Sequence, residues 1–131
     1  MSLPTLNNIL YVEDEEDIRT IVQFALENLG GYTLKVCRSG QEAIEAASQL
    51  TPDLMLFDVM MPKMDGPTTL KILREKYSAF ENIPVIFMTA KVQPQEVEEY
   101  KRLGAIDVIT KPFDPMTLAD TLKKIWENHY G

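Results

Sequence analysis

The sequence is poor in cysteine and histidine, the residues that form disulfides and soft-metal sites. It contains one cysteine, Cys37, and one histidine, His129, in 131 residues. A single cysteine excludes an internal disulfide and a cysteine-based zinc cluster, and it is consistent with a reducing compartment. We interpret Cys37 as a small apolar residue at a strand end and His129 as a solvated residue at a helix end.

Long hydrophobic runs and basic residues are also scarce. No stretch approaches the roughly 20 apolar residues of a membrane span, and the N-terminus lacks the basic segment and apolar run of a signal peptide. We therefore expect a cytoplasmic protein without membrane contact. The chain has 13 Lys and Arg residues against 20 Asp and Glu residues, and its formal charge of −7 repels phosphate backbones. We expect no direct binding of nucleic acid by this chain.

Apolar residues, by contrast, are plentiful enough for one buried core. They make up 45% of the 131 residues, and this length is close to the commonest size of a single domain. A second domain would not fit. We expect one domain over residues 1–131.

Short apolar runs mark the expected strands. They occupy residues 9–12, 54–57, 85–88 and, more briefly, 108–109. Runs that are apolar on both faces are typical of central strands in a parallel sheet covered by helices. Residues 32–37 nearly alternate and include Lys35, a pattern typical of an edge strand.

Helical patterns separate these runs. Residues 18–29 place apolar side chains on one face at 3.6-residue spacing, and Gly30-Gly31 ends that helix. Ser39 is a plausible N-cap for a second helix, and Asp114 for a last helix with Pro115 at its first position. Weaker helical patterns lie at residues 70–77 and 97–103. Five alternations of strand and helix predict a doubly wound α/β domain.

Polar residues follow the apolar runs at the carboxyl ends of the expected strands. Ligands of open parallel sheets bind at these ends. Glu13 and Asp14 follow the first strand, Asp58 the third, Thr89 the fourth and Lys111 the fifth. The fold would therefore bring three carboxylates, a hydroxyl and an ammonium group into one crevice.

Each of these residues alone has an ordinary explanation. Asp14 is a suitable helix cap, Asp58 can begin a turn, Thr89 favours strands, and Lys111 can lie in an exposed loop. Together they point to a metal, because carboxylates held close to one another repel unless a cation joins them. Oxygen ligands with access to water suit Mg²⁺.

The chain resembles the receiver domain of bacterial two-component response regulators, the family that includes the chemotaxis regulator. The matching segments are residues 9–15, 52–66, 85–90 and 104–113, and the resemblance runs from about Leu6 to Asn128. It implies a receiver-domain core at about residues 6–128. It also implies a flavodoxin-like five-stranded sheet in the order 2-1-3-4-5, flanked by five helices, and a cis Lys111-Pro112 peptide.

The resemblance also implies a metal site and a phosphoryl acceptor. Asp58 would accept the phosphoryl group. Glu13 and Asp14 would hold Mg²⁺ together with Asp58 and the backbone carbonyl of Met60. A carboxylate nucleophile beside a cation suits phosphoryl transfer, in which positioning and electrostatics supply most of the catalysis.

Two further residues would contact the transferred group. Thr89 would donate a hydrogen bond to one phosphoryl oxygen, and Lys111 would pair with another. The donor would be a phosphohistidine on a sensor histidine kinase or a phosphotransfer protein. The chain would then be a phosphoacceptor that dephosphorylates itself slowly, rather than a turnover enzyme.

The resemblance implies partners for the phosphorylated state and residues that modulate it. The output would go to a downstream effector protein or a covalently linked output domain, and phosphorylation-dependent homodimerisation stays open. Met60 and Lys91 would flank the approach of water to phosphorus. Val108 departs from the family pattern, because many members carry Tyr or Phe there and use that ring to report phosphorylation.

Two other functions compete with that of a phosphorylated receiver domain. A pseudo-receiver would keep the fold and signal without phosphorylation, but it usually lacks an acidic or lysine position, and all five are present here. A phosphatase of the haloacid dehalogenase type needs two aspartates one residue apart after its first strand. Here Asp14 is followed two positions later by Glu16 instead of a second aspartate, and no cap domain can be found in the sequence.

Overall fold

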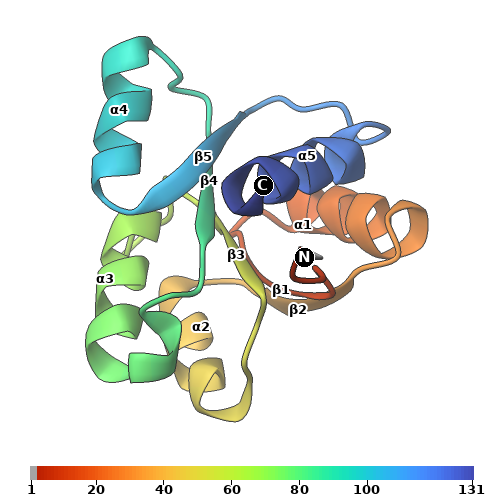
Figure 1. The fold of residues 1–131 in the computed structure, drawn as a ribbon. Coiled ribbons are helices and arrows are strands. Elements are labelled where there is room, and N and C mark those ends of the chain that lie inside the picture. The colour runs from red at the N-terminus through yellow and green to blue at the C-terminus, as the bar shows by residue number, and fades with distance from the viewer. Residues whose placement is uncertain (1–2) are drawn as a thin grey trace.

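The chain forms one parallel sheet with helices on both faces. The computed structural model describes residues 3–131, so Met1 and Ser2 of the predicted 1–131 domain lie outside the described residues. Within residues 3–131 the sheet has five strands in the order β2-β1-β3-β4-β5 (Figure 1). The strands are β1 Asn8–Val12, β2 Thr33–Cys37, β3 Leu54–Asp58, β4 Val85–Thr89 and β5 Ala105–Thr110. The predicted doubly wound fold and strand order are confirmed.

Helices α1 and α5 cover one face of the sheet, and α2, α3 and α4 cover the other (Figure 1). The α-helices are α1 Glu16–Gln23, α2 Gly40–Ala46, α3 Gly66–Lys76, α4 Pro94–Arg102 and α5 Leu118–Tyr130. Short turns of other helix types extend three of them: η1 Phe24–Leu29, η2 Ala47–Gln49 and η3 Ser78–Phe80. The five predicted helices are present.

The burial of the strands follows their composition. All residues of β3 and β4 are buried, as their continuous apolar runs predict. Within residues 3–131, strand β2 pairs with β1 alone and alternates between exposed and covered residues, which confirms the predicted edge strand. Each face of the sheet therefore carries its own apolar core under its own helices.

The first helix departs from the predicted single stripe. After Gln23 the chain winds as a π-helix, η1. The wider turn shifts side chains around the axis, so Leu29 is 46% exposed although the 3.6-residue pattern placed it inward. Ile21, which lies before this segment in α1, is also predicted to point inward but is 43% exposed. Val22 and Leu26 are buried as predicted.

Of the two helix caps predicted from the sequence, the one at Ser39 is present and the one at Asp114 is not. The Ser39 hydroxyl accepts a hydrogen bond from the Glu42 N–H at 3.1 Å and caps α2. Asp114 is not the cap of α5, because its carboxylate accepts from the Met116 N–H in a separate turn and the helix starts after Thr117. Within residues 3–131, no helix is both long and apolar enough to cross a lipid bilayer.

Candidate functional site

Lys111 joins the ends of two strands in a buried acidic site. Its Nζ lies 2.7 Å from Glu13 Oε1 and 2.8 Å from Asp58 Oδ1. Glu13 follows β1 and is fully buried, whereas Asp58 ends β3 and is 4% exposed. The strand order places β1 beside β3, so two carboxylates share one ammonium group.

Asp14 adds a third carboxylate. Ligand atoms of Glu13, Asp14 and Asp58 lie within 4.8 Å of one another. Asp14 Oδ1 is buried and has no hydrogen-bond partner among residues 3–131. Asp14 does not cap α1, because the cap position belongs to Glu15. An unpaired buried carboxylate oxygen beside two further carboxylates fits a hard divalent cation such as Mg²⁺.

The charges of the site act on one another. The pKa of Glu13 is raised to about 7: burial raises it most, the hydrogen bond from Lys111 lowers it, and the charge of Asp58 raises it. Burial also raises the pKa of Asp58, again against the effect of Lys111. Burial lowers the pKa of Lys111, but its hydrogen bonds to Asp58 and Glu13 outweigh burial and raise it. Lys111 therefore remains an ammonium group.

Arg19 fixes the loop that carries the acidic pair. Its Nη1 donates to the carbonyls of Glu13 and Asp14, at 2.9 and 2.8 Å. Arg19 lies in the first turns of α1, so it ties the helix start to the end of β1. Sequence reasoning missed this role. The available signal was a cation one turn into the helix that follows the acidic pair.

Gly66 lets the start of α3 approach the end of β3. A Cβ atom at Gly66 would lie 2.5 Å from the backbone oxygen of Asp58, closer than any real contact. The Gly66 N–H donates to the Val59 carbonyl at 3.0 Å, which closes the loop after β3. Asp65 precedes it and caps α3 with a hydrogen bond from the Thr68 N–H. Sequence reasoning placed a turn here and missed the close contact.

Thr89 ends β4 beside the acidic site. It is 2% exposed, and its hydroxyl accepts a hydrogen bond from the Lys91 N–H at 3.1 Å. Its carbonyl accepts from the Lys111 N–H at 2.9 Å, which aligns the ends of β4 and β5. Within residues 3–131 its hydroxyl makes no hydrogen bond to Asp58 or Lys111. The structure thus brings Thr89 to the same sheet edge as the acidic site, without a hydrogen bond to Asp58 or Lys111 within residues 3–131.

The three residues expected to modulate the site differ in exposure. Met60 is 64% exposed, and Lys91 is exposed as well. Val108 is half-buried on β5 and lies opposite Phe87 of β4. The Lys111-Pro112 peptide is cis, as expected.

An apolar cavity of about 330 Å³ adjoins the acidic site on the α1 side. Ile18 and Ile21 of α1 form one wall. The loop after β5 forms the other through Pro112, Phe113 and Pro115. The cavity shares Lys111 with the acidic site, so a partner seated there would lie next to Asp58.

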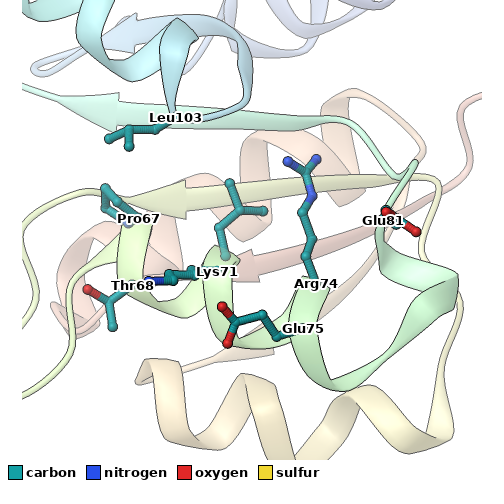
Figure 2. Close-up of a pocket in the computed structure, with 8 residues that line it drawn as sticks. Pro67, Thr68, Lys71, Arg74, Glu75, Glu81 and Leu103 are labelled. Atoms are coloured by element: carbon teal, nitrogen blue, oxygen red, sulfur yellow. The ribbon is translucent and has the colours of Figure 1, made fainter.

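A larger cavity of about 620 Å³ lies elsewhere, between α3 and the end of α4 (Figure 2). Arg74 crosses it and donates to the carbonyls of Phe80 and Ile83. Gly104, at φ 121°, leaves room for this guanidinium, because a Cβ there would meet Arg74 Nη1 at 2.5 Å. The cavity is lined by residues other than those of the acidic site. Arg74 therefore has a structural role in holding the segment before β4.

Comparisons with known proteins agree with this geometry. A family model described as the response regulator receiver domain matches residues 9–123. The chain is 39% identical over 117 residues to the alkaline phosphatase synthesis transcriptional regulatory protein PhoP of Bacillus subtilis, covering 89% of this chain and 47% of that protein. It is 36% identical over 112 residues to the regulatory protein AtoC of Escherichia coli, covering 86% of this chain and 23% of that protein. The chain thus spans less than half the length of these two relatives.

Solved structures show the same relationship. The chemotaxis response regulator CheY4 of Vibrio cholerae is 32% identical, with a TM-score of 0.83 and coverage of 92% of this chain and 99% of that one. The signal receiver domain of a signal transduction histidine kinase from Syntrophus aciditrophicus is 34% identical, with a TM-score of 0.77. The match covers 93% of this chain and 91% of that one. With the family model matching most of its length, the chain belongs to the response regulator receiver domains.

Proposed function

We propose that this chain accepts a phosphoryl group on Asp58 from a phosphohistidine of a sensor histidine kinase or a phosphotransfer protein. The observation that carries the proposal is the partly buried ammonium group of Lys111, which joins Asp58 and Glu13 beside Asp14, whose Oδ1 has no hydrogen-bond partner among residues 3–131. All five polar positions are intact, which supports phosphorylation over a pseudo-receiver role.

The residues of the chain carry out the transfer as follows. An Asp58 carboxylate oxygen attacks phosphorus and forms a new P–O bond while the P–N bond to the donor imidazole breaks. The imidazole nitrogen keeps the electron pair of that bond. The Lys111 ammonium group exchanges one of its present hydrogen bonds for a hydrogen bond to a phosphoryl oxygen. The Thr89 hydroxyl donates a hydrogen bond to another phosphoryl oxygen. Both donors oppose the negative charge of the phosphoryl group.

The metal would be held by the three carboxylates and by the Met60 carbonyl. Mg²⁺ supplies positive charge for the phosphoryl oxygens when it is bound. Glu13 and Asp14 bring the carboxylates that the ion needs, and the Arg19 contacts hold their backbone in place. Asp58 belongs to both the metal site and the acceptor site.

The phosphoryl group stays on the protein, so the chain is a phosphoacceptor rather than a turnover enzyme. Met60 has no side-chain oxygen to orient water, and Lys91 lies near Thr89, so we expect slow self-dephosphorylation. The modification would switch contacts with an effector protein or an output domain, or between two phosphorylated copies. Because Val108 carries no aromatic ring, the relay to that output would differ from members with Tyr or Phe there.

The kinase or phosphotransfer protein would dock over the apolar cavity beside Lys111. Ile21 is 43% exposed at its rim, and Phe113 forms its opposite wall. A partner that covers exposed apolar side chains so close to Asp58 can place its phosphohistidine in line with the carboxylate.

Intact-mass spectrometry tests the proposal. The purified chain is treated with acetyl phosphate with and without Mg²⁺, and we expect one phosphoryl adduct that forms only with the metal. Asp58→Asn should show no adduct. Asp53→Asn is the matched control, because Asp53 lies at the other end of β3 and accepts hydrogen bonds from the Asn7 and Asn8 N–H groups. An undiminished adduct on Asp58→Asn would refute the assignment.

A further inference from the structure

The cavity between α3 and the end of α4 has no part in the proposed phosphoryl transfer. Its volume of about 620 Å³ lies within the range of about 300–1,000 Å³ that is typical of small-molecule sites (Figure 2). Helix α4 contributes no buried residue, which agrees with an incomplete cover over this part of α3. The cavity is therefore large enough for a small organic molecule.

Part of the cavity surface is apolar. Pro67 and Leu70 of α3 supply it together with Leu103, which follows α4 (Figure 2). Leu103 is 47% exposed, so a ligand in the cavity can remove apolar surface from water. These residues favour a ligand with an apolar body.

Arg74 supplies a fixed cation in the same cavity. Its Nε and Nη2 donate to the carbonyls of Phe80 and Ile83, at 3.4 and 2.9 Å, so the guanidinium is held in one orientation. Its Nη1 donates no hydrogen bond within residues 3–131. In that part of the chain, the buried side-chain polar atoms without a partner belong to Tyr11 and Asp14 alone, so Arg74 Nη1 is open to solvent.

The free edge of the guanidinium lies close to the apolar surface. A Cβ atom at Gly104 would lie 2.5 Å from Arg74 Nη1 and 3.5 Å from Leu70 Cδ2, and Gly104 directly follows Leu103. A carboxylate is the partner that suits this edge, because its oxygens accept charge-assisted hydrogen bonds from a guanidinium. The site thus combines a place for a carboxylate with a place for an apolar group.

The other charged residues of the cavity leave Arg74 available. Lys71 lines the cavity one helical turn before Arg74 and adds a second positive charge. Glu75 and Glu81 also line it, but within residues 3–131 neither forms an ion pair with Lys71 or Arg74. The chain as a whole carries a charge of −7, so an anion needs specific contacts of this kind to bind.

We propose that the cavity between α3 and α4 binds a small organic carboxylate. The carboxylate accepts hydrogen bonds from Arg74 Nη1, and the apolar body of the ligand covers Pro67 and Leu103. The cavity shares no lining residue with the acidic cluster, so binding requires neither Mg²⁺ nor phosphorylation of Asp58. The inference therefore stands independently of the proposed function.

Titration of the whole chain with phenylacetate tests the proposal. We expect saturable shifts of the Leu103 methyl and Arg74 Nε–H signals in NMR spectra, with a dissociation constant of about 1 mM. Phenylacetamide keeps the ring and lacks the charge, whereas acetate keeps the charge and lacks the ring. Each should bind at least about tenfold more weakly. Equal affinity for phenylacetamide or acetate, or no saturable shift with phenylacetate, would overturn the inference.

A change at the apolar surface gives a second test. Leu103→Ser should weaken phenylacetate binding about fivefold, measured at the Arg74 Nε–H signal, and should fold because the side chain is half exposed. Leu29→Ser is the matched control. Leu29 is 46% exposed and lies in η1 on the other face of the sheet, so this change should leave the affinity unaltered. Equal affinities in the two variants would contradict the site.

A change at the cation separates binding from stability. Arg74→Gln loses the contacts with the Phe80 and Ile83 carbonyls, so we expect it to lower the melting temperature as well. The informative measurement is the preference for phenylacetate over phenylacetamide, which a merely less stable chain would keep. Arg74→Gln should abolish this preference, and an undiminished preference would overturn the role of Arg74. If this variant does not fold, the Leu103→Ser comparison decides.

Discussion

Cys37 lies at the edge of the acidic site but is chemically protected. Its carbonyl accepts a hydrogen bond from the Glu13 N–H at 3.1 Å, so the residue supports the site through its backbone. The side chain is fully buried, and burial, followed by the charge of Glu42, raises the pKa of the thiol to about 11. The reactive thiolate is therefore rare at neutral pH.

This burial predicts slow alkylation of the folded chain. At pH 8 only about one thiol in a thousand should be ionised, and reaction with iodoacetamide should speed up as the pH rises toward 11. The same chain in urea should react rapidly at pH 8, because its thiol regains an ordinary pKa. Mass spectrometry over time measures both rates. Fast labelling of the folded chain at pH 8 would contradict the protected thiol.

At the scale of elements, the start of α3 sets the position of the end of β3, where the proposed phosphoryl acceptor Asp58 lies. Gly66→Ala would force a Cβ against the Asp58 carbonyl, and we expect a loss of about 1–3 kcal/mol in the free energy of unfolding. Phosphorylation by acetyl phosphate should also slow, because the strand end must shift. Urea unfolding and adduct formation measure the two effects.

The control for this prediction is another change at a helix start. Ser39→Ala removes the cap of α2 and should cost about 1 kcal/mol of stability while leaving the phosphorylation rate near that of the parent. Equal slowing in both variants would show that lost stability, rather than the position of Asp58, controls the rate.

The elements also show how far the sequence could predict the molecule. Apolar runs on both faces identified β3 and β4, and the polar residues after each run identified the acidic site, because parallel strands end at one sheet edge. The resemblance supplied the strand order. The start of α5 was mispredicted, because an Asp-Pro pair suits a turn as well as a cap.

Other features depended on distances that no local pattern encodes. The contacts of Arg19 with two carbonyls and the close approach at Gly66 appear only once the loops are placed. In the sequence, Tyr11 is one more apolar residue of a strand. Only the placement of its neighbours shows that its hydroxyl has no hydrogen-bond partner among residues 3–131. The roles of Met60, Lys91 and Val108 stay predictions.

For the whole molecule, Mg²⁺ should act as a stabilising ligand. Binding to the folded state alone adds about 2.7 kcal/mol at a free concentration one hundred times the dissociation constant. We expect the melting temperature to rise by several degrees with Mg²⁺ and to return when a chelator removes it. Differential scanning calorimetry measures the change.

Asp14→Ala should abolish this shift, because it removes the carboxylate whose Oδ1 has no hydrogen-bond partner among residues 3–131. Asp53→Ala, at the opposite end of the sheet, should keep it, although losing its hydrogen bonds lowers the starting temperature. A full Mg²⁺ shift in Asp14→Ala would place the metal elsewhere.

The ion pair between Lys111 and Glu13 joins residues 98 positions apart. Contacts of such high sequence separation form late, because much of the chain must be ordered before they can close. During synthesis Asp58 leaves the ribosome well before Lys111, so an unfinished chain holds its acceptor carboxylate without the ammonium group. Under the proposed function, the ability to accept the phosphoryl group would therefore arise only once the end of the last strand has folded against the first and third strands.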